Sequence, residues 1–348
     1  MLFCIIIQDG NKSIILTRQS GKIREDGRKP YKITMTFERK KTYNEQIAAT
    51  YHEGALPPVF GFDLEDPSFG PFAETYFSDG VTRFVSVAAY TAARLALVSD
   101  DVSLYERVMA GMNREALTMV ILSAYEETGE TAVISRVMTD GYLALFREDS
   151  ELGGKLMSTR NRVLICTGED VLFGIGDVGK LADSAGSLRI DPDDFEGENV
   201  LGAVLTDVRK RLWLDYIERS ERFLSRVLND DDMLKWCRSY SFVVENPAYP
   251  EMETALNVFL RDAHRSGLSS TDFARVLAEA EIDEESIWRG SPGWLRHMSY
   301  DALLACMAFQ FRARHSMGTL MDSSIGKGAL LPYFAELRYR LLRETFLR

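Results

Sequence analysis

The residues of this chain that could do chemistry together lie in one stretch between residues 170 and 211. Asp170 provides a carboxylate, and three residues later Phe173, Gly174 and Gly176 form an aromatic-Gly-x-Gly turn. Because glycine has no side chain, such a turn lets backbone amides come close to a ligand. The ring of Phe173 offers a surface for stacking. The pattern predicts a ligand site that begins at Asp170.

An amphipathic helix must hold the second half of this stretch. Apolar residues recur there with the spacing of one helix face, and charged residues occupy the other face. The apolar positions are Leu201, Val204, Leu205, Val208 and Leu212. The start of this helix holds Gly197, Glu198 and Asn199, where capping side chains and free N–H groups favour anions. We expect the turn and the helix start to face the same hollow.

The spacing of these residues resembles the C-terminal signature of the NADAR or YbiA-like superfamily. That signature reads D-x-x-(aromatic)-G-x-G, a variable insert and then G-x-N-x-L-G-x-x-L-x-x-V-R. Members of the superfamily are α+β N-glycosidases that act on ADP-ribose adducts or on riboflavin-pathway intermediates. The resemblance implies a catalytic role for Asp170 and substrate binding by Phe173, Gly174, Gly176, Asn199 and Gly202. The alternative is a glycine-rich turn that leads into an ordinary core helix, with Asp170 only capping the turn.

A weaker match to the same superfamily lies upstream. Gly70-Pro71-Phe72 takes the place of the family's S-N-F turn, and Asp79-Gly80 marks the hairpin before the family's first long helix. We place that helix at residues 84–98. Its Tyr90 matches a family position, and Arg94 lies one position from the family's Lys. The resemblance implies that both contact the substrate.

Three departures from the family pattern bear on catalysis. The family helix carries a Glu-His pair before its Tyr, and the Glu is the residue credited with the chemistry. Here Ala88 and Ala89 occupy the two positions. The family's Trp in a later helix is absent, and Ile165 or Cys166 stands where its strand ends in a Glu. We therefore expect impaired catalysis.

Other sequence patterns exclude alternative chemistries. The run from Gly174 to Gly179 satisfies G-x-G-x-x-G, but the helix after it is too short for a dinucleotide fold. Five carboxylates between residues 191 and 198 lack a regular metal-ligand spacing, which favours a solvated loop over a cation site. The four histidines are dispersed and suggest no catalytic pair. We predict no cofactor and no metal.

Composition indicates a globular protein with a locally basic start. The 348 residues are 46% hydrophobic and carry a formal charge of -11, which argues against nucleic-acid binding over the whole surface. Residues 12–41 nevertheless hold ten Lys or Arg against three acids. This segment is either a solvated hairpin face or a basic lip for a phosphate-bearing ligand or nucleic acid.

The cysteine pattern and the hydropathy suggest where the protein works. Its four cysteines lie far apart and indicate neither a zinc site nor a disulfide framework. We therefore expect a reducing, cytoplasmic setting. No segment approaches the roughly 20 apolar residues of a membrane span, so we expect no membrane association.

The predicted fold class is α+β, a small mixed sheet surrounded by helices. Three parts are expected: a basic β-rich segment at 1–61, a NADAR-like domain at 62–215 and a helical domain at 216–348. Strands are predicted at 2–8, 12–17, 31–37 and 162–167, with an irregular loop at 44–81. Helices are predicted at 103–111, 114–125, 131–147, 200–227, 251–266, 270–281, 293–316 and 329–347.

Two functions remain open from the sequence. In one, the chain binds an ADP-ribose-like or nucleotide-like ligand, or hydrolyses its N-glycosidic bond through Asp170. In the other, it is a non-catalytic protein that uses the scaffold and the helical domain for protein contacts, including homo-oligomers. The absence of the family Glu at Ala88 favours the second function, since loss of a catalytic carboxylate commonly costs several kcal/mol of barrier.

Overall fold

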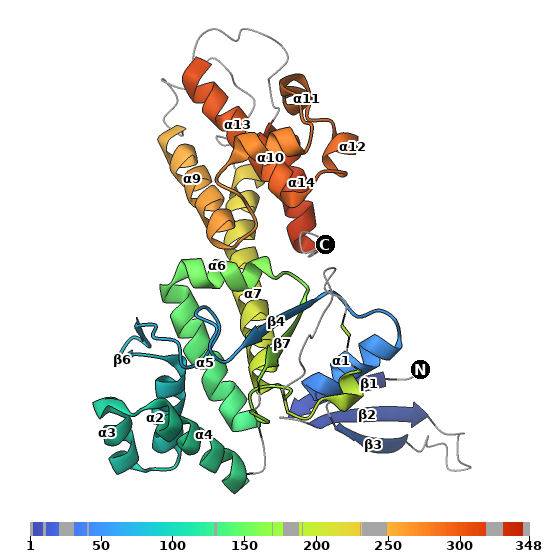
Figure 1. Cartoon of the computed structure of the whole chain (residues 1–348). Coiled ribbons are helices and arrows are strands. Elements are labelled where there is room, and N and C mark those ends of the chain that lie inside the picture. Colours follow the sequence, from blue (N-terminus) through green and yellow to red (C-terminus); the bar gives the residue numbers. More distant parts are fainter. Residues whose placement is uncertain are drawn as a thin grey trace, which may run out of the picture.

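The computed structural model shows an α+β protein with a small N-terminal sheet, a central mixed region and a helical C-terminal region (Figure 1). The residues it describes are 3–9, 12–20, 31–39, 42–128, 131–168, 170–176, 188–189, 191–229, 231, 249–317 and 330–343. This arrangement confirms the predicted fold class.

The N-terminal sheet is an antiparallel meander of three strands. They are β1 (Phe3–Asp9), β2 (Lys12–Ser20) and β3 (Tyr31–Arg39), with β2 in the middle. Ile15 of β2 pairs with Ile6 on one side and with Thr36 on the other. The three predicted strands are thus confirmed. The predicted turn at 10–11, the loop at 21–30 and the side chains of the basic segment 12–41 lie outside the described residues.

A pair of parallel strands lies at the centre of the next region. They are β4 (Val59–Asp63) and β7 (Val163–Thr167), paired so that Gly61 faces Ile165. The three middle residues of β7, Leu164, Ile165 and Cys166, are apolar and buried, as expected for a strand covered on both faces. A short hairpin, β5 (Phe77–Ser78) and β6 (Arg83–Phe84), turns at the predicted Asp79-Gly80.

Helices surround these strands. Around the hairpin lie α2 (Val87–Val98), α3 (Val102–Gly111) and α4 (Arg114–Thr128), followed by α5 (Ala132–Glu148) and α6 (Ser150–Ser158). The long helix α7 (Val200–Asn229) runs beside β7 and continues into the helical region (Figure 1). Its predicted apolar stripe, from Leu201 to Leu212, is buried.

The irregular loop predicted at 44–81 is wrong in two places. The structure has a helix there, α1 (Tyr43–His52), and the strand β4. Thr42 and Glu45 form a capping box in which Thr42 Oγ1 accepts from the Glu45 N–H and Glu45 Oε2 accepts from the Thr42 N–H at 2.7 Å. The pattern T-x-x-E is a helix-start signal. The prolines and glycines that follow in the sequence favoured a loop, so this helix start was not recognised.

Several helix boundaries differ from prediction because short polar side chains cap helices locally. Helix α3 is capped by Asp101, whose Oδ1 accepts from the Leu104 N–H, and not by Ser103 as predicted. Helix α6 was not predicted, although Asp149 caps its first turn. The predicted helix 293–316 is interrupted near Ser299, whose Oγ accepts from the Ala302 N–H at 3.1 Å.

The C-terminal region is helical in its described part. Its helices are α9 (Tyr249–Arg265), α10 (Phe273–Glu279), α11 (Glu284–Arg289), α12 (Pro292–Leu295), α13 (Tyr300–Met317) and α14 (Leu330–Leu342). Helix α11 was missed, although Asp283 caps its start and Gly290 ends it at φ +50°. The six residues of α11 are too few for a periodic apolar pattern.

One hydrophobic core extends through the central and C-terminal regions. Buried residues from Phe62 to Leu341 form a single cluster, and α7 contributes to it on both sides of the predicted boundary at 215. A smaller cluster of Ile47, Val59, Ile165 and Ile175 lies under α1. The domain division at 61 and 215 stays a prediction, because nothing in the fold tests it directly. Among the described helices, none is long and apolar enough to cross a bilayer.

Candidate functional site

The first group of candidate residues is the turn that begins at Asp170. Asp170 Oδ1 accepts hydrogen bonds from the N–H groups of Leu172 at 2.8 Å and Phe173 at 3.0 Å. The carboxylate is thus the cap of its own turn, which is a common role for Asp. Its second oxygen has no hydrogen-bond partner among the described residues. Asp170 itself is half-buried.

The backbone of this turn binds the start of α7. The N–H groups of Asn199, Val200 and Leu201 donate to the carbonyls of Gly174, Leu172 and Phe173 at 3.0 to 3.2 Å. The first N–H groups of a helix have no partner inside the helix. Here the turn supplies the partners. These amides are therefore not free to receive an anion, contrary to what the sequence suggested.

The glycines of the signature allow close packing of the chain on itself. A Cβ on Gly202 would lie 2.4 Å from the Leu164 carbonyl oxygen, so α7 approaches β7 closely only because no side chain is there. A Cβ on Gly174 would lie 3.1 Å from the Cys166 carbonyl oxygen. Gly176 has φ +94°, which other residues rarely adopt. Close approach at Gly174 and Gly202 is thus between two parts of the backbone.

Asn199 joins the turn, the helix and the strand. It is fully buried and has φ +50°, a left-handed conformation that Asn tolerates better than most residues. Its Oδ1 accepts from the Cys166 N–H at 3.0 Å, which links α7 to β7. Its Nδ2 is buried and has no partner in the described part of the chain. The predicted role of Asn199 at the helix start is confirmed in position, while its ligand contact stays a prediction.

Two positions that the family resemblance singles out, Phe173 and the position of the family Glu at Ala88, are packed in the hydrophobic core. The ring of Phe173 has no exposed surface and packs edge-on against Phe72, with the ring centres 6.3 Å apart. Ala88 is also fully buried, and its N–H donates to the Pro71 carbonyl at 2.8 Å. In this arrangement Phe173 has no exposed face for stacking, and its contact with a substrate stays a prediction.

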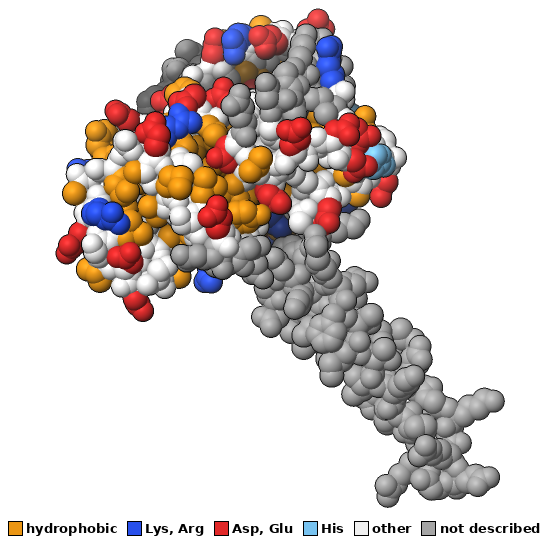
Figure 2. Space-filling view, turned by 60° about the horizontal axis from the view of Figure 1, so that its bottom comes forward, with side chains coloured by type: hydrophobic (Ala, Val, Ile, Leu, Met, Phe, Trp, Pro, Cys, Tyr) orange, Lys and Arg blue, Asp and Glu red, His pale blue; other side chains and the backbone are white. Residues whose placement is uncertain are grey.

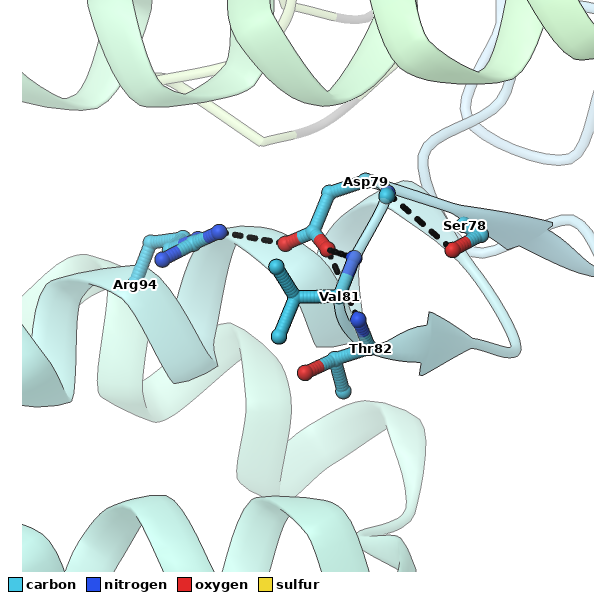
Figure 3. A network of polar contacts seen from close by, with 6 residues as sticks. Ser78, Asp79, Val81, Thr82 and Arg94 are labelled. Atoms are coloured by element: carbon cyan, nitrogen blue, oxygen red, sulfur yellow. Dashed lines mark hydrogen bonds and ion pairs between the residues drawn. The ribbon is translucent and has the colours of Figure 1, made fainter.

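A second group of candidate residues lies on α2 and the β5–β6 hairpin (Figure 3). Arg94 forms an ion pair with Asp79, whose other oxygen accepts from the N–H groups of Val81 and Thr82 at 2.9 and 2.8 Å. Burial alone would raise the pKa of Asp79, but these hydrogen bonds and the charge of Arg94 together lower it. Arg94 therefore fixes the hairpin turn against the helix.

Tyr90 belongs to the same group. Its ring meets Phe84 edge-on at 5.0 Å and lies against Gly141 of α5, where a Cβ would come within 2.6 Å of the ring. The guanidinium carbon of Arg94 lies 5.4 Å from the ring centre. Burial raises the pKa of the Tyr90 hydroxyl, so it is a neutral donor near pH 7.

The two groups are separated by the segment Gly70-Pro71-Phe72. Pro71 contacts α2 through the Ala88 N–H, and Phe72 contacts the Asp170 turn through Phe173. The turn and the start of α7 are thus brought together as predicted. Tyr90 and Arg94 make their described contacts with the hairpin, through Asp79, Phe77 and Phe84, and their place in a shared substrate site stays a prediction.

Sequence reasoning missed a polar cluster between α1, α7 and β7. The Tyr43 hydroxyl lies 2.9 Å from Thr206 Oγ1 and donates to the Leu164 carbonyl at 3.2 Å. Nearby, Arg209 is 7% exposed, and its Nη1 donates to Thr159 Oγ1 at 2.7 Å. Burial lowers the pKa of the Arg209 guanidinium. The only sequence signal for this cluster was the position of Arg209 at the edge of the apolar stripe of α7. An Arg at such a position is usually exposed, so its burial could not be predicted.

Three potential metal-ligand atoms also come together on the surface. Those of His52, Asp191 and Asp193 lie within 4.8 Å of one another, and His52 Nε2 lies 3.0 Å from an Asp193 oxygen. All three side chains are largely exposed, and a hydrogen-bonded pair accounts for the contact. The helix that carries His52 was not predicted, so the sequence could not place it beside the acidic run.

Cys166 is the only described cysteine near the Asp170 turn. Burial, with smaller contributions from the charges of Asp63 and Asp170, raises the pKa of its thiol to about 12. A thiol needs a lowered pKa to act as a nucleophile at neutral pH. Cys166 is therefore an inert core residue.

These elements define an α+β domain in which a glycine-rich turn and the first turn of a long helix pack on a short parallel strand pair. A family model of the NADAR domain matches residues 65–213. Residues 65–213 are thus identified as a NADAR domain. No curated protein and no solved structure matches the chain.

Proposed function

We propose that this protein keeps the NADAR scaffold without N-glycosidase chemistry and uses it for protein–protein assembly. The observation that carries the proposal is Ala88. It takes the place of the family's Glu, it is fully buried, and its backbone N–H is paired with Pro71. Cleavage of an N-glycosidic bond needs a carboxylate near the sugar and a positioned water. The position that would supply this carboxylate in the family is here a packed alanine.

An exposed apolar surface supports the assembly role. Large hydrophobic side chains with 38 to 66% exposure lie on α2, α3 and α4. They are Leu97, Val98, Val102, Met109 and Met119. Hydrophobic side chains gather on this end of the molecule in Figure 2. Contiguous exposed apolar surface is typical of sites that contact another protein, and we assign it to contact with a second copy of this chain.

The loss of chemistry is tested by incubating the full chain with ADP-ribose and with ADP-ribosylated nucleic acid. We expect no release of base or of ribose above the rate without protein. The matched variant is Asp170→Asn, which keeps the oxygen that caps the turn but removes the charge. Turnover by the parent that disappears in this variant would show that the glycosidase chemistry persists.

Assembly is tested by the molar mass from light scattering across a range of protein concentrations. We expect the mass of the parent to rise with concentration, and the variant Val102→Asp to remain a monomer. Leu342→Asp is the matched control, because Leu342 is 61% exposed and lies on α14 in the C-terminal region. A parent that is monomeric at every concentration would rule out self-assembly.

A second candidate function is binding of a nucleotide-like ligand without cleavage. Asp170 favours it, because one of its carboxylate oxygens has no partner among the described residues. Such a ligand would raise the midpoint of thermal unfolding. If the protein binds such a ligand, ADP-ribose should raise the midpoint of thermal unfolding of the parent. It should leave the midpoint of Asp170→Asn unchanged.

A further inference from the structure

A hollow lies where the NADAR domain meets the helical C-terminal region. Its volume is about 210 Å³, several times what one water molecule needs. Helices α5, α6 and α7 line one side and the last turn of α9 lines the other. The lining residues used below are Arg147, Asp215, Arg219, Asp262, Arg265 and Ser266. We call this space the junction hollow.

The two sides of the junction hollow are held together by very close packing. A Cβ on Gly154 of α6 would lie 2.3 Å from the Arg265 carbonyl oxygen, and a Cβ on Gly267 would lie 2.6 Å from the Gly154 carbonyl oxygen. Side chains at these two positions would push α6 and α9 apart. The hollow is therefore bounded by backbone that has little freedom to move.

The charges around the junction hollow do not balance. Arg147 donates to Asp215 through Nε and Nη2 at 3.2 and 2.8 Å. Arg219 Nε donates to Asp262 at 3.2 Å. Each of these ion pairs is neutral as a whole. Arg265 is an exposed residue at the mouth of the hollow, and its side chain has no ion pair or hydrogen bond in the part of the chain that the structure describes, so it adds one positive charge there.

A serine hydroxyl lies on the same space. Ser266 is only 3% exposed as a residue and lines the hollow, and its Oγ has no hydrogen-bond partner among the described residues. The hydroxyl is therefore open to a ligand or to water in the hollow. Ser266 and the neighbouring Arg265 thus present an unfilled donor and an unpaired cation to one hollow.

The remaining walls limit what can bind. Phe146, Met157 and Leu212 supply an apolar wall, so a hydrocarbon part of a ligand would be accommodated. The volume is below that of pockets for drug-sized molecules. The first turn of α6 and the last turn of α9 both reach the hollow, and their dipoles have opposite signs there. The excess charge therefore comes from Arg265.

We propose that the junction hollow binds a small anionic molecule, with one phosphate or carboxylate group held by Arg265 and Ser266. Arg suits this role because its planar guanidinium donates to two oxygens of such a group at once. The ligand would touch helices of the NADAR domain and of the C-terminal region together. Its binding would therefore stabilise the junction between them.

The test measures binding by the full chain with calorimetry and with the midpoint of thermal unfolding. The probes are inorganic phosphate, pyrophosphate and succinate, with sodium chloride at matched ionic strength as the salt control. We expect saturable binding of at least one probe, and an affinity lower by about tenfold or more in Arg265→Gln. Phosphates and succinate separate the two anion classes.

A matched control removes a positive charge from the same helix. Arg261→Gln is suitable, because Arg261 is exposed one turn earlier in α9 and does not line the hollow. It should bind like the parent. Hydrogen exchange in the parent should slow in both α6 and the end of α9 when the probe binds, which locates the site without any substitution.

Three results would overturn the proposal. They are the absence of saturable binding with all three probes, a response that sodium chloride reproduces, and equal affinities of Arg265→Gln and the parent. None of these bears on glycosidase chemistry or on the assembly surface of α2–α4. Anion binding at the junction hollow can thus be disproved while the proposed function holds. The proposed function can likewise be disproved while anion binding holds.

Discussion

At the scale of single residues, the NADAR signature of this chain is used for internal structure. Asp170 caps its turn, Asn199 ties α7 to β7, and Phe173 fills the core next to Phe72. Each of these interactions would also be needed to hold a ligand site in shape. Ala88 occupies the position of the family Glu, and the proposed loss of chemistry rests on that substitution. The signature residues that are present, Asp170, Phe173 and Asn199, are those that hold the fold together.

Returning a Glu to the family position should not restore activity. The variant Ala88→Glu would place a carboxylate where no surface is exposed and no partner is described. Burial of an unpaired polar or charged group is among the few changes that cost more than about 3 kcal/mol of unfolding free energy. Urea unfolding should show this loss, while Ala110→Glu on the exposed side of α3 should cost far less. A stable Ala88→Glu variant would mean that a cavity exists beside α2.

The ion pair of Asp79 and Arg94 predicts a dependence of stability on pH. The pKa of Asp79 is lower in the folded protein than in the unfolded chain, where it is about 3.9. Its contribution is therefore complete above that value, and it is lost as the pH falls through the folded pKa. Asp79→Asn should lower the unfolding free energy by about 1–3 kcal/mol at pH 7.

The measurement for Asp79 is urea unfolding between pH 7 and pH 2. The difference between parent and Asp79→Asn should shrink as the solution becomes more acidic. Glu74→Gln is the control, because Glu74 is an exposed acid in the same segment without a described partner. A difference that stays constant down to pH 2 would contradict a charge-based role.

At the scale of elements, sequence patterns predicted the long and regular parts well. The apolar stripe of α7, the three N-terminal strands and the Asp79-Gly80 hairpin all have strong local signals. Short helices such as α6 and α11 have too few turns for a periodic pattern to be detected. Their caps, Asp149 and Asp283, were readable but are also common in loops.

The candidate site was harder to predict for a physical reason. A glycine that lets a ligand approach and a glycine that lets a strand approach have the same sequence signature. Gly202 proved to be of the second kind, since Leu164 lies where its side chain would be. Phe173 was ambiguous in the same way, because an aromatic ring can stack on a ligand or fill a core. Only long-range packing decides between these roles.

The contact of α7 with β7 can be tested through Gly202. Gly202→Ala would place a Cβ 2.4 Å from both the Leu164 carbonyl oxygen and Asn199 Oδ1, so the helix or the strand must move. Overpacking of this kind costs about 1–3 kcal/mol of unfolding free energy, or more where backbone is involved. Gly293→Ala is the control, since no atom lies within 4 Å of its added Cβ. Equal midpoints of urea unfolding for the two variants would show that α7 packs differently.

At the scale of the whole molecule, one continuous core and one shared helix join the NADAR domain to the C-terminal region. The Tyr216 and Tyr300 hydroxyls lie 3.0 Å apart in this core, and Phe223 of α7 meets Phe334 of α14. A chain organised in this way should unfold as one unit, because neither part buries its apolar surface alone.

Removing a ring from the C-terminal part of the core should therefore destabilise the NADAR domain as well. Phe334 is fully buried, and Phe334→Ala should lower the unfolding free energy by about 3–5 kcal/mol. Helix content and the fluorescence of the buried Trp213 on α7, followed with the other three tryptophans replaced by Phe in both parent and variant, should both shift to the same lower midpoint. Leu342→Ala at an exposed position of α14 is the control. If Trp213 kept its original midpoint while part of the helix signal melted earlier, the two regions would be independent units and α7 would only connect them.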